Sequence, residues 1–360
     1  MRLCRQCLSL IGKGELSEEC EACCNAFDRV EEFAESIVKK LSGYEFQTFN
    51  VGSRVWGSAR ALHELLKGRG IEYNMKREFN DSLGRKISEL GGKIRSPKSD
   101  INVIFDLETF NFELQVRPVY IYGRYIKRVR NISQTRWICG FCMGKGCEIC
   151  NFTGKKYGTS VEELISTPTI GIFEAKDAKL HGAGREDVDA RMLGRGRPFV
   201  LEVIDPRKRF VDLEELERTI NEYARGKVKV LGLEYTDSKM VREVKMERHR
   251  KRYRVKIAFD DEVSTESLVK ALESLKGEIR QRTPKRVVHR RSDRVRVRRV
   301  YDTKLLFHSG RVAVVEIDAE AGLYIKELVS GDDGRTQPSL SSILGVNGRV
   351  EKLDVLDVFD

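Results

Sequence analysis

The stretch Arg294-Val295-Arg296-Val297-Arg298 alternates arginine and valine at every position. A β-strand sends successive side chains to opposite faces of its sheet, so this alternation predicts a strand with valines toward a core and arginines outward. Strand-like runs recur through the second half of the chain, with helical patterns at residues 213–224 and 266–275 between them. The runs cover residues 199–203, 228–233, 253–259, 295–300 and 312–317.

The connections between these runs indicate the type of sheet. Some of them are too short for the helical crossovers that parallel neighbours need. We therefore predict an α+β fold whose second half is a mixed or antiparallel sheet with helices on one face.

The predicted strand lies in a strongly basic segment. Between residues 280 and 299 the chain carries ten arginines and lysines, opposed only by Asp293, and residues 248–254 are similar. The net charge of the whole chain is +11. Because self-repulsion disfavours such segments unless phosphates neutralise them, the pattern favours a nucleic-acid partner. Two plainer readings remain: a well-solvated charged surface, and an edge strand that uses charge to prevent aggregation.

The first half of the chain mixes helical and strand-like patterns. Apolar residues recur at helical spacing over residues 26–41. Shorter helix-like pieces follow at residues 58–67 and 82–90, and strand-like pieces at residues 101–105 and 112–116. This order predicts an α+β accessory domain.

All nine cysteines fall in two clusters, and none follows Cys150. A secreted disulfide protein would spread its cysteines, whereas a reducing cytosol favours metal ligation. The second cluster has the spacing of two zinc knuckles, which is Cys139-x2-Cys142-x4-Cys147-x2-Cys150.

The first cluster repeats this pattern with a longer spacer. Its two pairs are Cys4-x2-Cys7 and Cys20-x2-Cys23, and the odd Cys24 could replace Cys23 as a ligand. Spacing alone also leaves pairing across the two clusters open. We predict one or two structural Zn²⁺ ions, because four cysteines close the coordination shell and leave no position for water.

Residues 181–194, HGAGREDVDARMLG, bracket a dense set of charges with glycines. The carboxylates between arginines could hold a metal, act as a nucleophile or act as a base. A solvated loop with compensating charges fits the same pattern. Spacing does not choose among these readings.

The charged segment is also part of a family resemblance. Residues 185–199, REDVDARMLGRGRPF, resemble the signature of the archaeal and eukaryotic pseudouridine synthase family that forms pseudouridine 54 and 55 in the tRNA T-arm. Gly184-Arg185-Glu186-Asp187 is similar to the Gly-Arg-x-Asp loop of other tRNA pseudouridine synthases. Further matches are YIYGRY at residues 120–125, QTRW at 134–137, TPKRVVHRR at 283–291 and GLYIKEL at 322–328.

The resemblance implies an isomerase that converts uridine 54, uridine 55 or both in the T-arm to pseudouridine. It implies Asp187 as the catalytic carboxylate, with Asp189 as the runner-up. It implies that Tyr253 packs against the target base and that Tyr324 also contacts the substrate. Lys326 stands where related synthases commonly carry arginine, and a lysine loses the bidentate geometry.

The implied reaction sets two further expectations. Isomerisation gains and loses no atoms and needs no redox change, so no organic cofactor is expected. A buried carboxylate needs a nearby cation to stay ionised, and Arg185, Arg191 and Lys326 are the candidates.

The resemblance covers nearly the whole chain and is weakest over residues 44–115, where the family carries a THUMP-type RNA-binding domain. We expect an N-terminal zinc module at residues 1–25, a THUMP-like accessory domain at 26–155 that ends in the second cysteine cluster, and a catalytic domain at 156–360.

Other functions stay open from the residues alone. A non-catalytic RNA-binding protein with zinc modules would bind tRNA and leave its uridines unchanged. A zinc-dependent deaminase is disfavoured, because no histidine of the chain begins a His-x-Glu motif. The chain has no apolar run near the roughly 18 residues of a membrane span and begins without a signal-peptide pattern. We therefore expect a cytoplasmic protein with tRNA as its partner, no membrane partner and no obligate protein partner.

Overall fold

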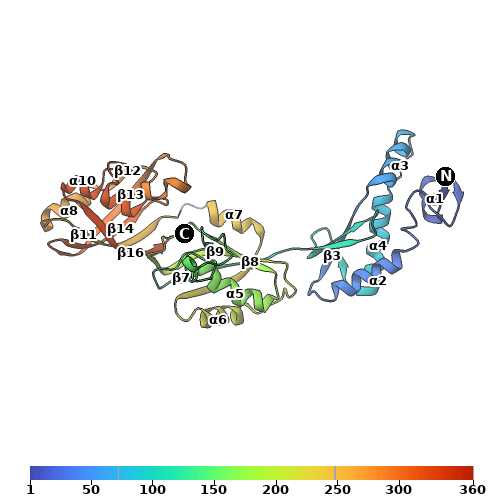
Figure 1. Ribbon diagram of the computed structural model, residues 1–360, viewed down its shortest axis with the longest axis horizontal. Helices are drawn as coiled ribbons and strands as arrows, with labels where there is room; N and C mark the ends of the chain where they lie inside the picture. Colours follow the sequence, from blue (N-terminus) through green and yellow to red (C-terminus); the bar gives the residue numbers. More distant parts are fainter. Residues whose placement is uncertain (72, 247–248, 360) are drawn as a thin grey trace. The chain divides into compact units, whose positions relative to one another are not determined.

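The computed structural model describes residues 1–71, 73–246 and 249–359 (Figure 1). Arg248 and the side chain of Arg290, which belong to the basic segments noted above, lie outside this description. The chain divides into two compact units. The first unit comprises Met1–Val119, Ile170–Asp177 and Val203–Val211, and the second comprises Tyr120–Thr169, Ala178–Glu202 and Asp212–Asp360.

The first unit is built mainly from the N-terminal third of the chain. Its elements, in chain order, are β1 (Arg2–Leu3), α1 (Arg5–Ile11), β2 (Glu15–Leu16), α2 (Val30–Leu41), β3 (Thr48–Arg54), α3 (Gly57–Gly68), α4 (Met75–Gly91), β4 (Ile94–Arg95), β5 (Ile101–Asp106) and β6 (Phe112–Val116).

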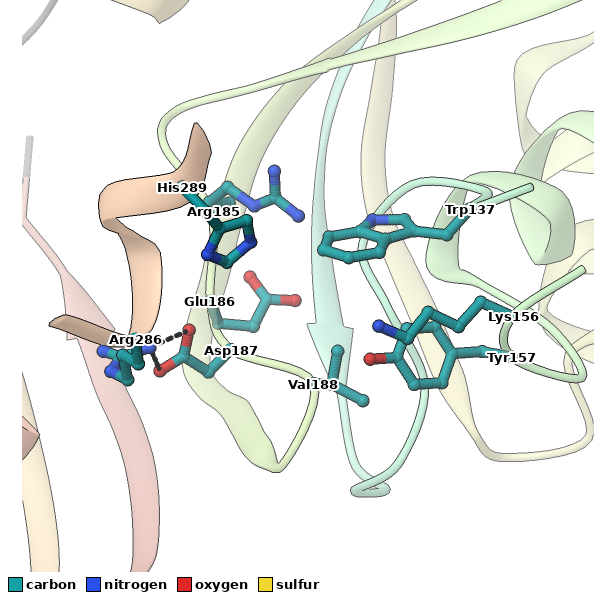
Figure 2. A pocket seen from close by; sticks show the side chains of 9 residues that line it. All are labelled: Trp137, Lys156, Tyr157, Arg185, Glu186, Asp187, Val188, Arg286 and His289. Atoms are coloured by element: carbon teal, nitrogen blue, oxygen red, sulfur yellow. Dashed lines mark hydrogen bonds and ion pairs between the residues drawn. The ribbon is translucent and has the colours of Figure 1, made fainter. Parts of the chain in front are cut away.

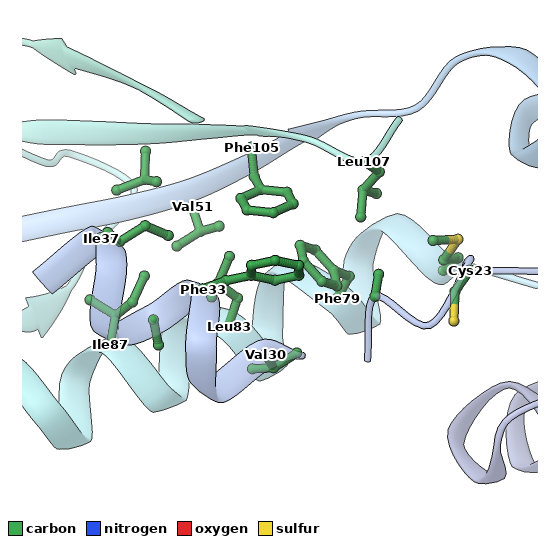
Figure 3. Close-up of a cluster of buried hydrophobic side chains, with 14 of the residues drawn as sticks. Cys23, Val30, Phe33, Ile37, Val51, Phe79, Leu83, Ile87, Phe105 and Leu107 are labelled. Carbon is green, nitrogen blue, oxygen red and sulfur yellow. The ribbon is translucent and has the colours of Figure 1, made fainter. Parts of the chain in front are cut away.

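A four-stranded sheet in the order β4-β3-β5-β6 organises this unit, with helices α2 and α4 packed against one another beside it. Alternate residues of β3 and β5 are buried, as expected for strands with one covered face. Figure 3 shows the resulting cluster, in which Phe33 of α2 and Phe79 of α4 meet Phe105 of β5 at ring-centroid distances of 4.8 and 5.2 Å. The same buried cluster includes Cys4, Cys7, Cys20 and Cys23, so the N-terminal cysteine module shares the core of this unit.

The second unit contains the longer strands. Its elements are β7 (Val119–Lys127), η1 (Glu148–Cys150), α5 (Val161–Phe173), β8 (Asp177–Gly182), β9 (Ala190–Ile204), α6 (Leu213–Tyr223), β10 (Val228–Thr236), α7 (Ser238–Met246), β11 (Lys251–Phe259), α8 (Thr265–Ser274), β12 (Gly277–Arg282), η2 (Lys285–Arg290), β13 (Val295–Ser309), β14 (Val312–Ala319), α9 (Ile325–Ser330), β15 (Thr336–Gln337), α10 (Leu340–Leu344) and β16 (Gly348–Val358).

These strands form one ten-stranded sheet in the order β10-β7-β9-β16-β11-β14-β13-β12-β15, with β8 paired to β9. Strands β9 and β16 run parallel, and every neighbouring pair from β16 to β15 is antiparallel. Helices α8, α9 and α10 pack on one another and on strands β13 and β16. The expected α+β class with a mixed sheet is confirmed.

The alternating arginines and valines do form a strand, but the expected orientation is wrong. Val295 and Val297 are 55% and 46% exposed. Residues opposite one another in an antiparallel pair share a face, and β12 sets Ile279 opposite Arg298 and Gln281 opposite Arg296. Ile279 and Gln281 are buried, so β13 turns these two arginines toward the partly covered face. The register of the sheet therefore overrides the local pattern of apolar residues.

The boundary between the units differs from the division expected at residues 155 and 156. Strand β7 pairs with β10 along most of its length, and the second cysteine cluster follows β7 within the second unit. Long-range strand pairing fixes this boundary, and no local composition signal marks it.

Among the described residues, no helix combines the length and the apolar character that a membrane crossing requires.

Candidate active site

The loop that carries Asp187 joins β8 to β9 at one end of the sheet. Gly184 adopts a left-handed φ of +73°, which lets the chain turn where Lys251 and Arg197 leave little room for a side chain. The backbone amide of Ala183 donates to the carbonyl of Pro198 at 2.9 Å, and the amide of Asn131 donates to the carbonyl of Val188 at 2.9 Å. Both ends of the loop are therefore fixed to neighbouring backbone.

A buried network beneath the loop holds it from below. The side chain of Glu186 is fully buried and accepts hydrogen bonds from Arg197 Nε at 2.9 Å and from the Tyr125 hydroxyl at 2.8 Å. The amide of Gln134 donates to the Tyr125 oxygen at 2.8 Å and to the carbonyl of Gly184 at 2.9 Å. Each buried polar group thus has a partner, which rigidifies the base of the loop.

Lys127 of β7 holds the loop through its backbone. Its buried Nζ donates to the carbonyls of Asp187 and Val188, both at 3.2 Å, and lies 3.9 Å from Glu186. Burial lowers the pKa of Lys127, while the charge of Glu186 opposes that shift. Because neighbouring residues 186 and 187 are turned to opposite sides, Glu186 anchors the loop and Asp187 reaches solvent.

Asp187 presents a partly exposed carboxylate, with 34% of its side chain accessible. The Nη1 atom of Arg286 lies 3.2 Å from its Oδ2, and Nζ of Lys326 lies 3.6 Å from the same oxygen. Two cations thus face one carboxylate, and both lie close enough to orient it.

Lys326 bonds more closely to the neighbouring carboxylate. Its Nζ lies 2.7 and 2.9 Å from the two oxygens of Asp189. Burial opposes ionisation of Asp189, but the hydrogen bonds and charge of Lys326 outweigh it and lower the pKa of that carboxyl. The structure therefore brings Asp187, Asp189 and Lys326 together, with the shorter contacts at Asp189.

Arg286 is oriented by a second carboxylate. Its Nε donates to Glu327 at 2.6 Å, and the Glu327 side chain is almost fully buried. Burial lowers the pKa of Arg286. The hydrogen bonds and charges of Glu327 and Asp187 raise the pKa by a larger amount, so the net shift is upward. Glu327 fixes the guanidinium plane and leaves Nη1 directed at Asp187.

The two tyrosines of the sequence analysis have different surroundings. Tyr253 of β11 is buried, and burial raises its pKa to about 12 although Arg197 lowers it. The charge of Asp187 contributes to the upward shift of this pKa. Tyr324 precedes α9, accepts a hydrogen bond from Arg291 Nη1 at 3.3 Å, and has the Arg286 guanidinium 6.0 Å from its ring centroid.

A cavity of about 230 Å³ opens beside Asp187 (Figure 2). One wall consists of the loop residues 185–188 with Arg286 and His289 of η2. The other wall comes from the chain that flanks the second cysteine cluster and consists of Trp137, Lys156 and Tyr157. One side of the cavity therefore carries charges of both signs, and the other side is mainly aromatic with one lysine.

The cations expected beside Asp187 are only partly those that the structure places there. Lys326 is one of them. Arg191 pairs with Asp354 at 2.6 Å, and the guanidinium of Arg185 lies 5.6 Å from the Trp137 ring centroid. The second cation is Arg286, which in the sequence belongs to a basic motif, and no local signal links it to a carboxylate 99 positions away.

The cysteines form two separate tetrads. Ligand sulfurs lie within 4.8 Å of one another in the set Cys4, Cys7, Cys20, Cys23 and in the set Cys139, Cys142, Cys147, Cys150. Four sulfurs held tetrahedrally at about 2.3 Å from Zn²⁺ are about 3.8 Å apart. Four of the sulfur–sulfur separations are 3.7 to 3.9 Å, which fits that geometry. Both sets could hold a metal ion, neither mixes the clusters, and Cys24 is exposed outside the first set.

Comparison with known proteins agrees with this arrangement. A family model described as "Pus10, C-terminal" matches residues 120–359, and one described as "Pus10 THUMP domain, archaeal" matches residues 33–106. The second match confirms the THUMP domain that the resemblance implied.

Curated relatives match along nearly the whole chain. The tRNA pseudouridine synthase Pus10 of Archaeoglobus fulgidus is 69% identical over 358 residues, which cover 99% of this chain and all of that protein. The proteins of the same name from Methanopyrus kandleri and Methanothrix thermoacetophila are 46% and 44% identical, and the alignments cover 95% and 99% of this chain and 81% and 80% of those proteins. A solved Cbf5–Nop10–Gar1 complex is 18% identical with a TM-score of 0.34 over 53% of this chain and 43% of that chain, too low to add to the assignment. With two family models and full-length relatives in agreement, the chain belongs to the Pus10 family of tRNA pseudouridine synthases, which are isomerases.

Proposed function

We propose that this chain converts uridine 54, uridine 55 or both in the tRNA T-arm to pseudouridine, with Asp187 as the catalytic carboxylate. The observation that carries the proposal is the position of Asp187: partly exposed beside a cavity, with Arg286 at 3.2 Å and Lys326 at 3.6 Å. Glu186, its neighbour in the loop, is buried and fully engaged with Arg197 and Tyr125.

The reaction breaks the N1–C1′ bond of the target uridine and joins C5 to C1′. The proton leaves C5 and one is gained at N1, so atoms balance without an oxidant, a reductant or an organic cofactor. An ionised carboxylate can attack as a nucleophile or stabilise developing positive charge on the sugar. Arg286 and Lys326 would hold the Asp187 carboxylate in position before the RNA binds.

The target base must leave the folded T-arm before it can reach Asp187. Extrusion costs on the order of a few kcal/mol, and stacking on an aromatic face returns about 1–3 kcal/mol per base. Tyr253 and Tyr324 are the proposed substrate-contacting tyrosines. The raised pKa of Tyr253 means that its phenol stays protonated at neutral pH and brings no charge to the site.

The substrate is proposed to be tRNA, bound through phosphate contacts. Basic side chains near the site include Arg185 on the catalytic loop and Lys326 on α9, both within reach of a backbone that passes Asp187. Phosphate contacts position an RNA without reading its sequence, so they do not choose between positions 54 and 55. We place the reaction in the cytoplasm, where the clustered cysteines would stay reduced.

The metal is proposed to be Zn²⁺ in both cysteine tetrads. Four thiolates close a tetrahedral shell, so such ions would stabilise the fold and take no part in the reaction. The first tetrad would hold α1 and the following loop to the core of the first unit. The second would fix the chain that forms the aromatic wall of the cavity.

The test is pseudouridine mapping on an unmodified tRNA transcript under excess enzyme. Wild type should convert the T-arm uridine, and Asp187→Asn should convert none while binding tRNA within a few fold of wild type. Asp189→Asn is the matched control, since it neutralises the adjacent carboxylate. Conversion by Asp187→Asn but not by Asp189→Asn would reassign the catalytic role to Asp189. Tight binding with no conversion by any protein would instead favour a non-catalytic RNA-binding protein.

A further inference from the structure

Two aromatic side chains lie across the cavity from the catalytic loop and have no part in the proposed chemistry. Trp137 and Tyr157 are half-buried, with ring centroids 5.8 Å apart and planes at 63°. Nζ of Lys156 lies 5.3 Å from the Trp137 centroid and 5.8 Å from the Tyr157 centroid. An aromatic corner with a lysine over both rings matches the chemistry that binds a nucleotide: a face for the base and a cation for the phosphate.

The corner is held by the backbone on both sides of the second cysteine cluster. The amide of Lys156 donates to the carbonyl of Trp137 at 2.9 Å, and the amide of Cys139 donates to the carbonyl of Gly154 at 2.8 Å. Ile138 and Lys155 also form an antiparallel bridge. Because the segments that enter and leave the cysteine loop are hydrogen-bonded to one another here, both rings are preorganised, which lowers the entropic cost of binding a base.

Figure 2 separates this corner from the reacting group. The carboxylate of Asp187 points toward Arg286, whereas Trp137 and Tyr157 lie on the other side of the cavity. Arg185 stands between the two sides, with its guanidinium 5.6 Å from the Trp137 centroid. A base stacked on Trp137 would therefore lie beside the catalytic loop and away from the face of Asp187 that Arg286 and Lys326 surround.

We propose that Trp137 and Tyr157 form a stacking platform for the nucleobase next to the target uridine in the RNA chain, with Lys156 at the intervening phosphate. The inference rests on the proposed function, since it requires an RNA whose target base lies at Asp187. The cavity of about 230 Å³ is below the roughly 300–1,000 Å³ of common small-molecule sites, which suits a single base. The platform would hold the backbone on one side of the extruded uridine.

Trp137 supplies its own reporter. The chain contains two tryptophans, Trp56 and Trp137, and Trp56→Phe leaves Trp137 as the only indole. Stacking of a nucleobase quenches indole fluorescence, so the emission of this single-tryptophan protein is measured while an unmodified T-arm stem–loop RNA is added. RNA binding is followed in parallel by filter retention. We expect saturable quenching with the same midpoint as binding.

Three RNAs identify the base that stacks. One has an abasic residue at the target position, and the other two have it at the nucleotide before or after. We expect quenching to persist with the target-abasic RNA and to disappear with one of the flanking-abasic RNAs. Loss of quenching with the target-abasic RNA alone would assign the platform to the target uridine and overturn the proposal. Binding without quenching of Trp137 by any RNA would also overturn it.

Activity gives a second, independent readout. Trp137→Leu should reduce kcat/KM for the T-arm RNA by about 10- to 100-fold, and Trp137→Phe, which keeps a stacking face, should recover most of that loss. Tyr223→Leu, a change at the end of α6 outside the cavity, is the matched control. A kcat/KM of Trp137→Leu equal to that of the wild type would refute the platform. If the wild-type protein has no activity but RNA still quenches the fluorescence of Trp137, the proposed function is refuted. Base binding at this corner is then still supported.

Discussion

The guanidinium of Arg286 lies 3.2 Å from the carboxylate of Asp187, although 99 positions separate the two residues in the chain. The same guanidinium donates from Nε to Glu327 at 2.6 Å. Arg286 therefore sits between two carboxylates that differ in exposure, since Glu327 is buried and Asp187 reaches the cavity. The buried partner orients the arginine, and the exposed partner accepts the hydrogen bond that this orientation leaves available.

Arg286→Lys tests whether this orientation matters for the proposed reaction. Lysine keeps the charge but lacks the planar guanidinium, whose separate nitrogens contact Glu327 and Asp187 at the same time. We expect the single-turnover rate of pseudouridine formation to fall by about 10- to 100-fold with tRNA affinity changed by only a few fold. Arg218→Lys on the exposed surface of α6 is the matched control. A parallel loss of affinity and rate would mean that Arg286 binds RNA and does not position Asp187.

Asp189→Asn tests the division of work between the two carboxylates. In the native site Lys326 bonds Asp189 at 2.7 Å and lies 3.6 Å from Asp187. Once Asp189 is neutral, Lys326 has Asp187 as its remaining charged partner, and Arg286 stays in place. We expect the rate to stay within about tenfold of wild type, measured by single-turnover mapping. A loss as large as that of Asp187→Asn would contradict the assignment of Asp187.

Much of the sheet could be predicted from the sequence because most strands carry their own pattern. The run at residues 312–317 becomes β14, and the run at 228–233 becomes β10. Helix α5 was missed because Pro168 interrupts its pattern. Strand β9 begins inside the charged segment, where Arg191 and Gly194 interrupt the strand-like pattern. Only the pairing with β16 identifies this part of the strand.

Fewer of the contacts in the candidate site could be predicted, because many of them depend on long-range strand pairing. Asp187, Asp189 and Lys326 lie in short motifs that can be compared with a family. The long-range contacts of the site depend on which strands pair, and no local spacing encodes that pairing. This holds for the contacts of Glu186 and Lys127 and for the contact between Arg286 and Asp187. The orientation of the arginines on β13 failed in the same way, because β12 decides which face of that strand is covered.

Lys251 predicts a specific dependence of stability on pH. Burial beside Arg197 lowers its pKa to about 7, while Glu186 opposes the shift. In the unfolded chain a lysine has a pKa of about 10.4, so between pH 7 and 10 the unfolded state holds the extra proton. The contribution of Lys251 to the free energy of unfolding therefore rises with pH across that window. Below pH 7 the charged Lys251 destabilises the folded state by its full amount.

The measurement is the unfolding midpoint of Lys251→Met and wild type between pH 6 and 9. The variant should be the more stable protein at pH 6, and its advantage should shrink as the pH rises from 7 to 9. Lys256→Met controls for the loss of another lysine from β11, where Lys256 pairs with Glu351 at 2.8 Å. A difference between Lys251→Met and wild type that stays constant across the window would show that Lys251 titrates normally.

Metal content distinguishes the cysteines of the first cluster. Cys20 is buried within the tetrad, whereas Cys24 is exposed beside it. We expect two Zn²⁺ ions per chain in wild type and in Cys24→Ser, and one in Cys20→Ser, by elemental analysis of the purified protein. Loss of the first ion should also lower the unfolding midpoint, because Cys4, Cys7, Cys20 and Cys23 belong to the core of the first unit. A reduced content in Cys24→Ser would make Cys24 a ligand.

Gly194→Ala tests whether the contact between β9 and β16 holds the loop of Asp187 in place. Gly194 has φ of +59°, and a Cβ there would lie 1.8 Å from the carbonyl oxygen of Leu356 in β16. Gly226 has φ of +73° with nothing within 4 Å of the same position, so Gly226→Ala is the control for backbone strain alone. We expect a loss in unfolding free energy of about 1–2 kcal/mol for Gly226→Ala and at least about twice that for Gly194→Ala.

Denaturant unfolding of both variants checks the difference, and pseudouridine mapping of the folded Gly194→Ala protein checks its consequence. The parallel pairing of β9 and β16 aligns Arg191 with Asp354, whose carboxylate also accepts from Arg130 at 2.5 Å. Pushing the strands apart at Gly194 should loosen these ion pairs, because Arg191 lies three residues before Gly194 and next to the loop of Asp187. The rate should therefore fall in Gly194→Ala and stay unchanged in Gly226→Ala. Equal stability losses would show that β16 yields to the added methyl group and that this contact does not position the loop.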